Sequence, residues 1–511
     1  FDVVDEYARL CPEKRALVWC NQKGEEKVIT FGEMKELSLK MCNVISSYGV
    51  KKGDFVMSML NRRWEYWVLV VACCKMGVVL IPATHMLTPK DVAYRVNEAG
   101  VKLLFATEEE DVAEHISLAL PDCKNLKGVL SVNGAHFDNL DEKLENAPAE
   151  FSFDARPNPR DLMLVYFTSG TTGMPKMVMH DFLYPLGHVF TAKYWQDVVD
   201  DGLHFTMAET GWAKCSWGKI YGQWISGTAV FAYDYHGRFT PTDVLPLVKK
   251  YGITTFCAPP TIYRFLVKED LSSFDLSSIK HCSTAGESLN PEVFKQFEKA
   301  TGLKIYEGFG QTEGTVMLGT FKYLSPVTGS LGKPSPLYDV RLIDDDENEV
   351  KPGEEGEIAI LKSENQCGLV AGYFKDEART AALKNDVYFH TGDLAYQDKD
   401  GWFWYVGRKD DIIKSSGYRI GPFEVESALM EHPAVLECAI TAVPDDLRGQ
   451  IVKATIVLTK NYQPSDELVK ELQNHVKKVT APYKYPRIVE FVKELPKTTS
   501  GKIRRVEIRE N

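Results

Sequence analysis

The sequence lacks an excess of positive charge, Cys-x-x-Cys pairs and long apolar runs. Lys and Arg number 60 against 71 Asp and Glu, and this net charge of −11 argues against a basic face for nucleic acid. No two of the 11 cysteines have the Cys-x-x-Cys spacing of a zinc site or redox motif. The apolar stretch 67–74 is too short to span a bilayer. The cysteine pattern therefore indicates reduced, mostly buried thiols in a cytosol-like compartment.

The length and composition are those of a globular protein with more than one core. The chain has 511 residues, of which 44% are hydrophobic and 26% charged, and a domain takes roughly 100–200 residues. The chain opens at Phe1 rather than Met, so a trimmed targeting segment would not be visible. We expect a cytoplasmic protein if the source is prokaryotic, and a mitochondrial matrix protein if it is eukaryotic and has lost a transit peptide. The oligomeric state is left open between a monomer and a homodimer.

Helix and strand patterns alternate along most of the chain, which predicts parallel strands with crossover helices and an α/β fold. Expected strands are 55–60, 78–82, 102–106, 161–167, 255–259, 281–285 and 303–305, and expected helices are 34–45, 63–76, 88–99, 260–267 and 291–300. Thr30 and Glu33 have capping-box spacing before the first of these helices. After about residue 320 the pattern changes to short strands separated by glycines, such as 353–361 and 401–406. The last hundred residues or so form a separate α+β pattern, which comprises strands 436–442, 452–459 and 487–492 and a helix 466–479.

The stretch 168–176, Thr-Ser-Gly-Thr-Thr-Gly-Met-Pro-Lys, follows an expected buried strand and is the strongest motif. Its backbone N–H groups, hydroxyls and lysine can surround an anionic phosphate chain, although a surface turn can have a similar composition. A Walker A loop is excluded because Met174 and Pro175 separate Gly173 from Lys176.

Three later segments carry residues that suit a nucleotide. In 306–313, Tyr-Glu-Gly-Phe-Gly-Gln-Thr-Glu, the glycines admit close approach of a ligand and Glu313 offers a hard oxygen for Mg²⁺, although a lone loop carboxylate is usually solvated. Asp393, in Thr-Gly-Asp, can accept hydrogen bonds from both ribose hydroxyls, or it can belong to a tight turn. The basic run 495–505, with Lys502, is by itself either a solvated tail or an anion site.

The stretch 168–176 resembles the Thr-Ser-Gly-Thr-Thr-Gly-x-Pro-Lys signature of the adenylate-forming enzymes: acyl-CoA synthetases, adenylation domains of peptide synthetases, and luciferases. The segments 285–288, 306–313, 391–393, 407–421 and 496–502 resemble further motifs of that family in the same order. The resemblance runs from about residue 20 to about residue 505.

The resemblance implies a role for each matching residue. Catalytic roles fall to Lys502, Thr312 and Glu313, with Glu313 as the Mg²⁺ ligand. ATP-binding residues would be Thr168, Ser169, Gly170, Thr171, Thr172, Gly173, Lys176, Gly286, Glu287, Ser288, Glu307, Gly308, Phe309, Gly310, Gln311, Thr312, Asp393, Arg408 and Lys502. Residues for coenzyme A (CoA) would be Ser416, Gly417, Tyr418, Arg448 and Tyr485, with Lys477 or Lys484 as weaker candidates.

The acyl pocket is expected around Trp212, Lys214, Gly310, Thr312 and Arg419, with Trp217 as a second apolar wall. Both tryptophans would also suit an ordinary core. The ammonium of Lys214 either reaches solvent or a carboxylate, or it discriminates among acids. Acetate-activating members carry Trp directly before Gln-Thr-Glu, whereas this chain has Gly310, past which a longer acyl chain could extend.

The family's architecture implies a large domain at 1–407 with mainly parallel sheets and a distorted β-barrel-like part, a hinge at 408–411 with Asp410 as pivot, and a small mobile α+β domain at 412–511. The implied function is an AMP-forming medium-chain acyl-CoA synthetase with ATP, CoA and a small carboxylic acid as substrates. Its alternatives are an aromatic acid CoA ligase of the benzoate or coumarate type and a non-catalytic nucleotide-binding regulator.

Overall fold

The computed structural model describes residues 2–109, 111–168, 175–237, 239–287, 289–364, 366–416, 418–497 and 503–510. The chain divides into two compact units. Unit 1 comprises 1–286, 297–325 and 364–381, and unit 2 comprises 287–296, 326–363 and 382–511. The expected hinge at 408–411 lies inside unit 2 and stays a prediction.

The first sheet of unit 1 has the strand order β19-β9-β8-β4-β3-β5-β6-β7. Its strands are β3 Phe55–Met59, β4 Val79–Pro82, β5 Val101–Thr107, β6 Gly128–Val132, β7 Asp138–Asn139, β8 Leu162–Thr168, β9 Lys176–Asp181 and β19 Gly372–Tyr373. The strands from β8 to β7 pair in parallel, as the alternation predicts. The strands β9 and β19 are antiparallel additions at the edge next to β8.

Local sequence signals place the helices that connect these strands. The helix α2 (Phe31–Ser47) starts at the predicted capping box, in which the Thr30 side chain accepts from the Glu33 N–H and the Glu33 carboxylate accepts from the Thr30 N–H. The helices α3 (Glu65–Met76) and α4 (Pro89–Ala99) end at Gly77 and Gly100, both in the left-handed conformation that glycine adopts without strain. The other helices of unit 1 are α1 Asp2–Leu10, α5 Val112–Ala119, α6 Leu140–Asn146, α7 Tyr184–Phe190, α8 Ala213–Gly218, α9 Tyr221–Ile225, α10 Pro241–Tyr251 and α11 Pro260–Leu266.

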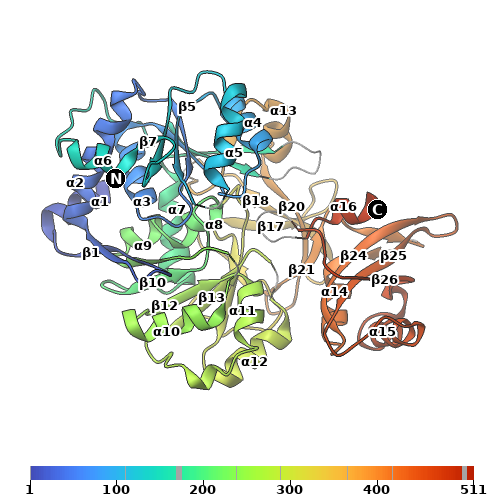
Figure 1. The fold of residues 1–511 in the computed structure, drawn as a ribbon. Helices are drawn as coiled ribbons and strands as arrows, with labels where there is room; N and C mark the ends of the chain where they lie inside the picture. The colour runs from blue at the N-terminus through green and yellow to red at the C-terminus, as the bar shows by residue number, and fades with distance from the viewer. Residues whose placement is uncertain are drawn as a thin grey trace. The chain divides into compact units, whose positions relative to one another are not determined.

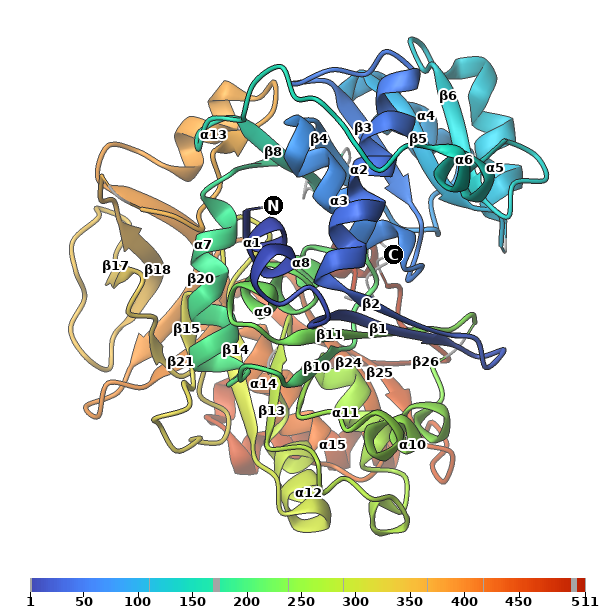
Figure 2. The same cartoon turned by 90° about the vertical axis from the view of Figure 1, so that its left-hand side faces the viewer.

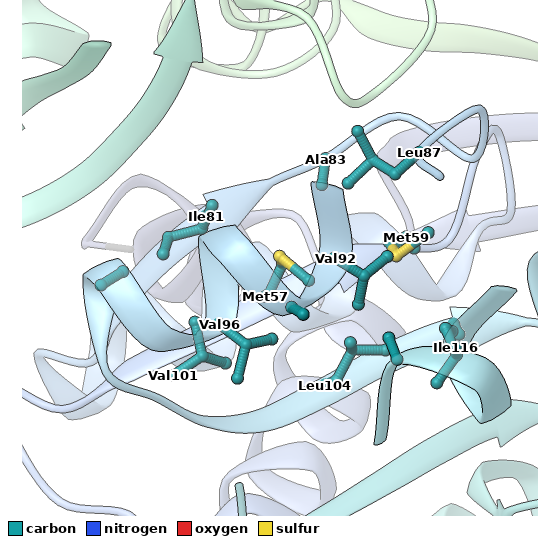
Figure 3. Close-up of a cluster of buried hydrophobic side chains, with 14 of the residues drawn as sticks. Met57, Met59, Ile81, Ala83, Leu87, Val92, Val96, Val101, Leu104 and Ile116 are labelled. Atoms are coloured by element: carbon teal, nitrogen blue, oxygen red, sulfur yellow. The ribbon is translucent and has the colours of Figure 1, made fainter. Parts of the chain in front are cut away.

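One face of this sheet forms a dry core with α4 and α5, which lie side by side in Figure 1. Met57 and Met59 of β3 point to this face and alternate with Val56 and Ser58, which are buried on the other face of the sheet. Figure 3 shows the side chains of this cluster between the strands and the two helices. The labelled members are Met57, Met59, Ile81, Ala83, Leu87, Val92, Val96, Val101, Leu104 and Ile116. Each fully buried aliphatic side chain here stabilises the fold by about 2 kcal/mol.

The second sheet of unit 1 has the order β15-β14-β13-β12-β10-β11-β1-β2 among its unit 1 strands. These are β1 Arg15–Asn21, β2 Glu26–Thr30, β10 Leu203–Thr206, β11 Ala229–Asp234, β12 Thr255–Ala258, β13 His281–Ala285, β14 Ile305–Phe309 and β15 Leu318–Gly319. The N-terminal strand β1 joins this sheet by pairing in parallel with β11. Figure 2 shows β1 and β2 beside β11, and α2 beside α3. The hairpin β1–β2 was not predicted from the sequence.

Unit 2 contains an antiparallel sheet of order β17-β18-β20-β21 and a second sheet of β22 to β26. Its strands are β16 Lys333–Pro334, β17 Asp339–Ile343, β18 Glu355–Leu361, β20 Tyr388–Gln397, β21 Phe403–Arg408, β22 Ile413–Ser415, β23 Tyr418–Ile420, β24 Val435–Asp445, β25 Gly449–Leu458 and β26 Ile488–Val492. The first of these sheets occupies the position of the expected β-barrel-like part. Within the described residues it is an open sheet and no closed barrel forms.

The C-terminal part of unit 2 has the predicted α+β pattern. Its helices are α14 Pro422–Met430, α15 Asp466–Val479 and α16 Arg505–Glu510. Leu468, Leu472 and Val476, spaced along one face of α15, pack into a core with α14 and the strands β24 and β25. Figure 1 labels these four elements in the C-terminal part of the chain. Two more helices, α12 (Pro291–Thr301) and α13 (Glu377–Leu383), contain residues of both units.

Throughout the part of the chain that the structure describes, no helix has both the length and the apolar character needed to cross a membrane.

Candidate active site

The two ends of the expected phosphate loop meet in a β-hairpin. The strand β8 ends at Thr168 and β9 begins at Lys176, and these two residues are partners in the antiparallel register. The predicted residues Ser169, Gly170, Thr171, Thr172 and Gly173 lie outside the described residues. The sheet therefore holds both anchors of the loop, because β8 is an interior strand and β9 pairs with β19 on its other side.

The Gln-Thr-Glu segment follows β14, and its position corrects one sequence prediction. The strand was expected at 303–305 with a loop from 306, whereas β14 runs from Ile305 to Phe309. Residues 306–309 therefore belong to the strand, because 306–308 pair in parallel with β13 and Phe309 pairs with Leu318 of β15. The predicted loop residues begin at Gly310.

The carboxylate of Glu313 accepts a hydrogen bond from the Tyr373 hydroxyl, with 2.9 Å between Oη and Oε1. The ammonium of Lys176 lies over the ring of the same tyrosine, 5.2 Å from its centroid. Tyr373 thus brings together the predicted phosphate lysine and the predicted metal ligand, which are far apart in the sequence.

His180 of β9 contacts the backbone of the same segment. Its Nε2 lies 2.8 Å from the carbonyl oxygen of Thr312, and the ring stacks on Tyr184 at 3.8 Å between centroids. Burial lowers the pKa of His180 to about 4, so the ring is neutral near pH 7. Since a carbonyl only accepts, Nε2 carries the proton and donates it to Thr312.

Two glycines of the 306–313 motif are packed against indole rings. A Cβ built on Gly308 would lie 2.5 Å from Cε2 of Trp195, and one on Gly310 would lie 2.5 Å from Cη2 of Trp217. At both positions the missing side chain makes room for a tryptophan, and the predicted approach of a ligand to these glycines stays a prediction. An acyl chain that runs past Gly310 would have to lie along Trp217.

The predicted acyl-pocket segment forms the short helix α8. Trp217 is 6% exposed and packs edge to face on Trp195 with centroids 6.0 Å apart, whereas Trp212 is half-buried at the start of the helix. The ammonium of Lys214 donates to the main-chain carbonyl oxygen of Ala285 at 2.7 Å. This contact joins α8 to the end of β13.

Unit 2 brings together the two residues expected at the ribose. The strands β20 and β21 place Asp393 opposite Arg408, whose Nη1 donates to Oδ2 of Asp393 at 3.3 Å and to the Thr391 carbonyl at 3.1 Å. The Tyr405 hydroxyl donates to Oδ1 of the same aspartate at 2.9 Å. Asp393 is only 4% exposed, so two donors compensate its burial.

The expected hinge follows β21 directly. The Nε of Arg408 lies 3.6 Å from Oδ1 of Asp410, and the Asp411 N–H donates to the Arg408 carbonyl to close a turn. The ammonium of Lys409 pairs with Asp345 at 2.8 Å and with Glu357 at 3.2 Å. Lys409 therefore ties this turn to the sheet β17-β18-β20-β21.

The described CoA candidates all lie in unit 2, at 416–418, at 448 and at 477–485. The Ser416 N–H donates to the Arg448 carbonyl at 3.0 Å, and Ser416 has a positive φ of 51°. Tyr418 stacks on Tyr483 with centroids 4.0 Å apart. The ring of Tyr485 lies below the ammonium of Lys477, and its hydroxyl accepts from Arg487 at 2.7 Å. Lys484 pairs with Glu424.

The remaining predicted residues have less informative positions. Gly286 has a positive φ of 105° after β13, Glu287 follows it and is half-buried, and the Glu307 side chain is buried in β14. Phe309 and Gln311 are half-buried, and Arg419 is exposed in β23. Ser288, Gly417 and Lys502 lie outside the described residues, so the structure does not place them.

The donor set around Glu313 suits Mg²⁺ bound together with a nucleotide. Among the described residues no group of three or more His, Cys, Asp or Glu side chains could hold a metal on its own. Mg²⁺ commonly takes one or two protein carboxylates, substrate phosphates and water; Glu313 would supply a carboxylate, and Lys176, which contacts the same tyrosine, would attract the phosphates.

Sequence reasoning missed three residues that contact the predicted ones, namely Tyr373, His180 and Tyr405. His180 stands four residues after Lys176, so β-strand alternation puts it on the same face of β9. Tyr405 is three residues before Arg408, a spacing that regular strand alternation would put on the opposite face. A register shift between Leu394 and Ala395, next to Tyr405, changes this alternation, so the shared contact with Asp393 could not be predicted. Tyr373 gave no local signal, because it meets Glu313 through the long-range pairing of its segment with β9 and with residues 313–314.

Comparison with known proteins identifies the family. The family model of the AMP-binding enzymes matches residues 4–374, and the model of the AMP-binding enzyme C-terminal domain matches residues 424–502. The chain belongs to the AMP-binding enzymes. Among members of this family, acyl-coenzyme A synthetase ACSM3, mitochondrial, of Mus musculus is 42% identical over 522 aligned positions, which cover 99% of this chain and 89% of the relative. Acyl-coenzyme A synthetase ACSM4, mitochondrial, of the same species is 43% identical, with 98% and 87% covered.

Solved structures of AMP-binding enzymes have the same fold. The anthranilate CoA ligase AuaEII in complex with anthranoyl-AMP superposes with a TM-score of 0.90 at 27% identity and covers 100% of this chain and 96% of its own. An acyl-CoA synthetase of Brucella canis has a TM-score of 0.75 at 30% identity, with 100% and 93% covered. The predictions of the adenylate-forming family, of its α/β fold and of the acid–thiol ligase class are confirmed by these matches.

Proposed function

We propose that this chain is an AMP-forming acyl-CoA synthetase for medium-chain carboxylic acids, which converts ATP, an acid and CoA to acyl-CoA, AMP and pyrophosphate. The observation that carries the proposal is the convergence of Lys176 and Glu313 on Tyr373 beside the hairpin β8–β9. The relationship to acyl-coenzyme A synthetases over nearly the whole chain supports the choice of acid and thiol as substrates.

The first half-reaction makes an acyl-adenylate. A carboxylate is already ionised at neutral pH, so its oxygen attacks the α-phosphorus of ATP without a general base while the bond to pyrophosphate breaks. What the reaction requires is alignment of two anions and neutralisation of the phosphates. Lys176 and the loop that it closes would hold the β- and γ-phosphates. Mg²⁺ held by Glu313 would supply further positive charge there.

Unit 2 would supply the ribose contacts and the catalytic lysine. Asp393, positioned by Tyr405 and Arg408, would accept hydrogen bonds from the ribose hydroxyls. The ammonium of Lys502 would bridge the acid carboxylate and the α-phosphate, as the family resemblance implies. Gly286, Glu287 and Ser288 would lie along the adenine.

The second half-reaction transfers the acyl group to sulfur. The CoA thiol loses its proton and attacks the acyl carbon, and AMP leaves. We propose that the part of the chain after Asp410 rotates between the two steps, withdrawing Lys502 and bringing 416–419 to the acyl-adenylate. Arg448 and Tyr485 would then contact CoA.

The tryptophan pair Trp195 and Trp217 would shape the acyl site. An apolar wall of this kind suits aliphatic chains of medium length, which pack along an indole face. The same wall would also accept a planar ring, and the structural match to an anthranilate CoA ligase makes an aromatic acid CoA ligase the second candidate. The relatives are mitochondrial, and we propose a mitochondrial location for this chain as well.

A panel of acids tests this function. The purified protein is incubated with Mg-ATP and CoA together with acetate, butyrate, 2-methylbutyrate, hexanoate, octanoate, benzoate or several amino acids, and thioester and AMP are measured. We expect kcat/KM to peak between butyrate and octanoate. Turnover of benzoate alone would favour the aromatic acid ligase, and absence of any turnover, with ATP still bound, would indicate a nucleotide-binding regulator.

A further inference from the structure

Tyr373 occupies a position between two residues that the proposed function needs. Its hydroxyl donates to Oε1 of Glu313 at 2.9 Å, and its ring faces the ammonium of Lys176 at 5.2 Å. The tyrosine is 6% exposed, so its own position is fixed by packing.

The backbone register explains how one tyrosine reaches both partners. Tyr373 of β19 pairs with Val178 of β9, two residues after Lys176, and side chains two apart share a face of a strand. The Ala371 N–H donates to the Met179 carbonyl and the Phe374 N–H to the Met177 carbonyl, at 2.8 and 2.9 Å. The segment 371–374 is thus held along β9, the strand that starts with the phosphate lysine.

The same segment also holds the backbone of Glu313. The Val370 N–H donates to the Glu313 carbonyl at 2.7 Å, and Leu369 forms a β-bridge with Gly314. The residue before the glutamate, Thr312, is held by His180 from β9. The main chain on both sides of the carboxylate is therefore fixed, and Tyr373 fixes the carboxylate itself.

We propose that Tyr373 is a positioning residue for the metal–phosphate site, which orients the carboxylate of Glu313 toward Mg²⁺ and confines the ammonium of Lys176. The inference rests on the proposed function, since it assumes that Glu313 and Lys176 meet the phosphates. A donor on Oε1 leaves Oε2 for the metal and keeps the carboxylate in one rotamer before the nucleotide binds.

The effect of such contacts on metal affinity and on the position of an ammonium has a known order of magnitude. Outer partners of metal ligands typically change metal affinity by about 10–100-fold when they are removed. An ammonium over a tyrosine ring adds a weaker attraction of roughly 0.5–2 kcal/mol, depending on its desolvation. The hydroxyl should therefore act mainly on the metal, and the ring mainly on the lysine.

Two substitutions separate these contributions. Tyr373→Phe removes the hydroxyl and keeps the ring, whereas Tyr373→Leu removes both. Tyr263→Phe is the matched control, because the Tyr263 hydroxyl is also buried and donates to the Ser283 carbonyl at 3.1 Å, in contact with none of the predicted site residues. A purely structural role of the hydroxyl would make Tyr373→Phe resemble this control.

The measurement is binding of Mn²⁺, a paramagnetic substitute for Mg²⁺, to the protein with a non-hydrolysable ATP analogue, followed by electron paramagnetic resonance. We expect Tyr373→Phe to raise the Kd for Mn²⁺ about 10-fold and to leave the Kd for the metal-free analogue within about twofold, while Tyr263→Phe changes neither. We expect Tyr373→Leu to weaken binding of the metal-free analogue as well. An unchanged Mn²⁺ Kd in Tyr373→Phe would overturn the inference.

A double variant tests whether a loss of Mn²⁺ affinity in Tyr373→Phe comes from the contact with Glu313 rather than from misfolding. If Tyr373 acts through Glu313, adding Tyr373→Phe to Glu313→Gln causes no further loss of Mn²⁺ affinity. Independent, additive losses would contradict the proposal. If the wild-type protein binds no Mn²⁺ with the analogue, the proposed function itself is contradicted. If the wild-type protein binds Mn²⁺ and Tyr373→Phe binds it equally well, only the role of Tyr373 is contradicted.

Discussion

At the scale of single residues, the proposed mechanism assigns the charged side chains to particular half-reactions. Lys176 and Glu313 belong to unit 1, whereas Asp393 and Arg408 belong to unit 2. In the proposed mechanism, Lys502 adds charge only while the acid attacks ATP. Its removal should therefore affect the two steps unequally.

Lys502→Ala should abolish adenylate formation, with a loss of at least about 100-fold, because in the proposed mechanism its ammonium bridges the carboxylate and the α-phosphate. Thioester formation from supplied acyl-adenylate should stay within a few-fold of wild type. Pyrophosphate release and single-turnover thioester synthesis measure the two steps separately. Equal loss in both would refute this division of labour.

Trp217→Leu should shift the preference toward longer acids, because the indole edge that fills the space at Gly310 is removed. We expect the ratio of kcat/KM for octanoate to that for butyrate to rise roughly tenfold. Thioester synthesis with each acid gives this ratio. The control is Trp402→Leu, because Trp402 is a half-buried tryptophan of unit 2 whose ring centroid lies 5.1 Å from the ammonium of Lys333. An unchanged ratio would place the acyl chain elsewhere.

At the scale of helices and strands, local sequence signals predicted the ends of several helices. The pairing of distant strands could not be predicted from such signals. The capping box at Thr30 and the glycine ends of α3 and α4 were readable, because each depends on neighbours in sequence. The pairing of β1 with β11 could not be predicted, since two strands that are far apart in the sequence carry no local signal of their pairing. The contact of Tyr373 with Glu313 was hidden for the same reason.

The turn after β21 gives the proposed rotation a testable element. Asp410→Pro fixes φ near −65° at the expected pivot, so we expect adenylate formation to persist while thioester formation falls by about tenfold or more. Asp410→Ala is the control, because it removes the carboxylate that pairs with Arg408 and leaves the backbone free. Both half-reactions are measured as above. A normal overall rate in the proline variant would argue against rotation at this residue.

At the scale of the whole molecule, buried neutral histidines link stability to pH. Burial lowers the pKa of His281 to about 4 and that of His204 to about 3, below the usual value of about 6.5. Between these values the unfolded chain binds protons that the folded chain does not, so stability is complete above about pH 6.5 and is lost as the pH falls.

We expect the free energy of unfolding to fall by about 1 kcal/mol for each of these histidines on going from pH 7 to about pH 5.5. Denaturant unfolding at several pH values measures the slope. His281→Gln, which can still donate to the Trp195 carbonyl, should reduce it. A stability that is flat or rises on acidification would contradict this expectation.

The proposed function as a whole depends on acyl-adenylate formation. The most direct measurement is exchange of labelled pyrophosphate into ATP with the protein, Mg²⁺ and hexanoate, without CoA. We expect exchange that requires the acid, and conversion to AMP and hexanoyl-CoA once CoA is added. Exchange independent of the acid, or ADP and phosphate as the products, would contradict the proposed chemistry.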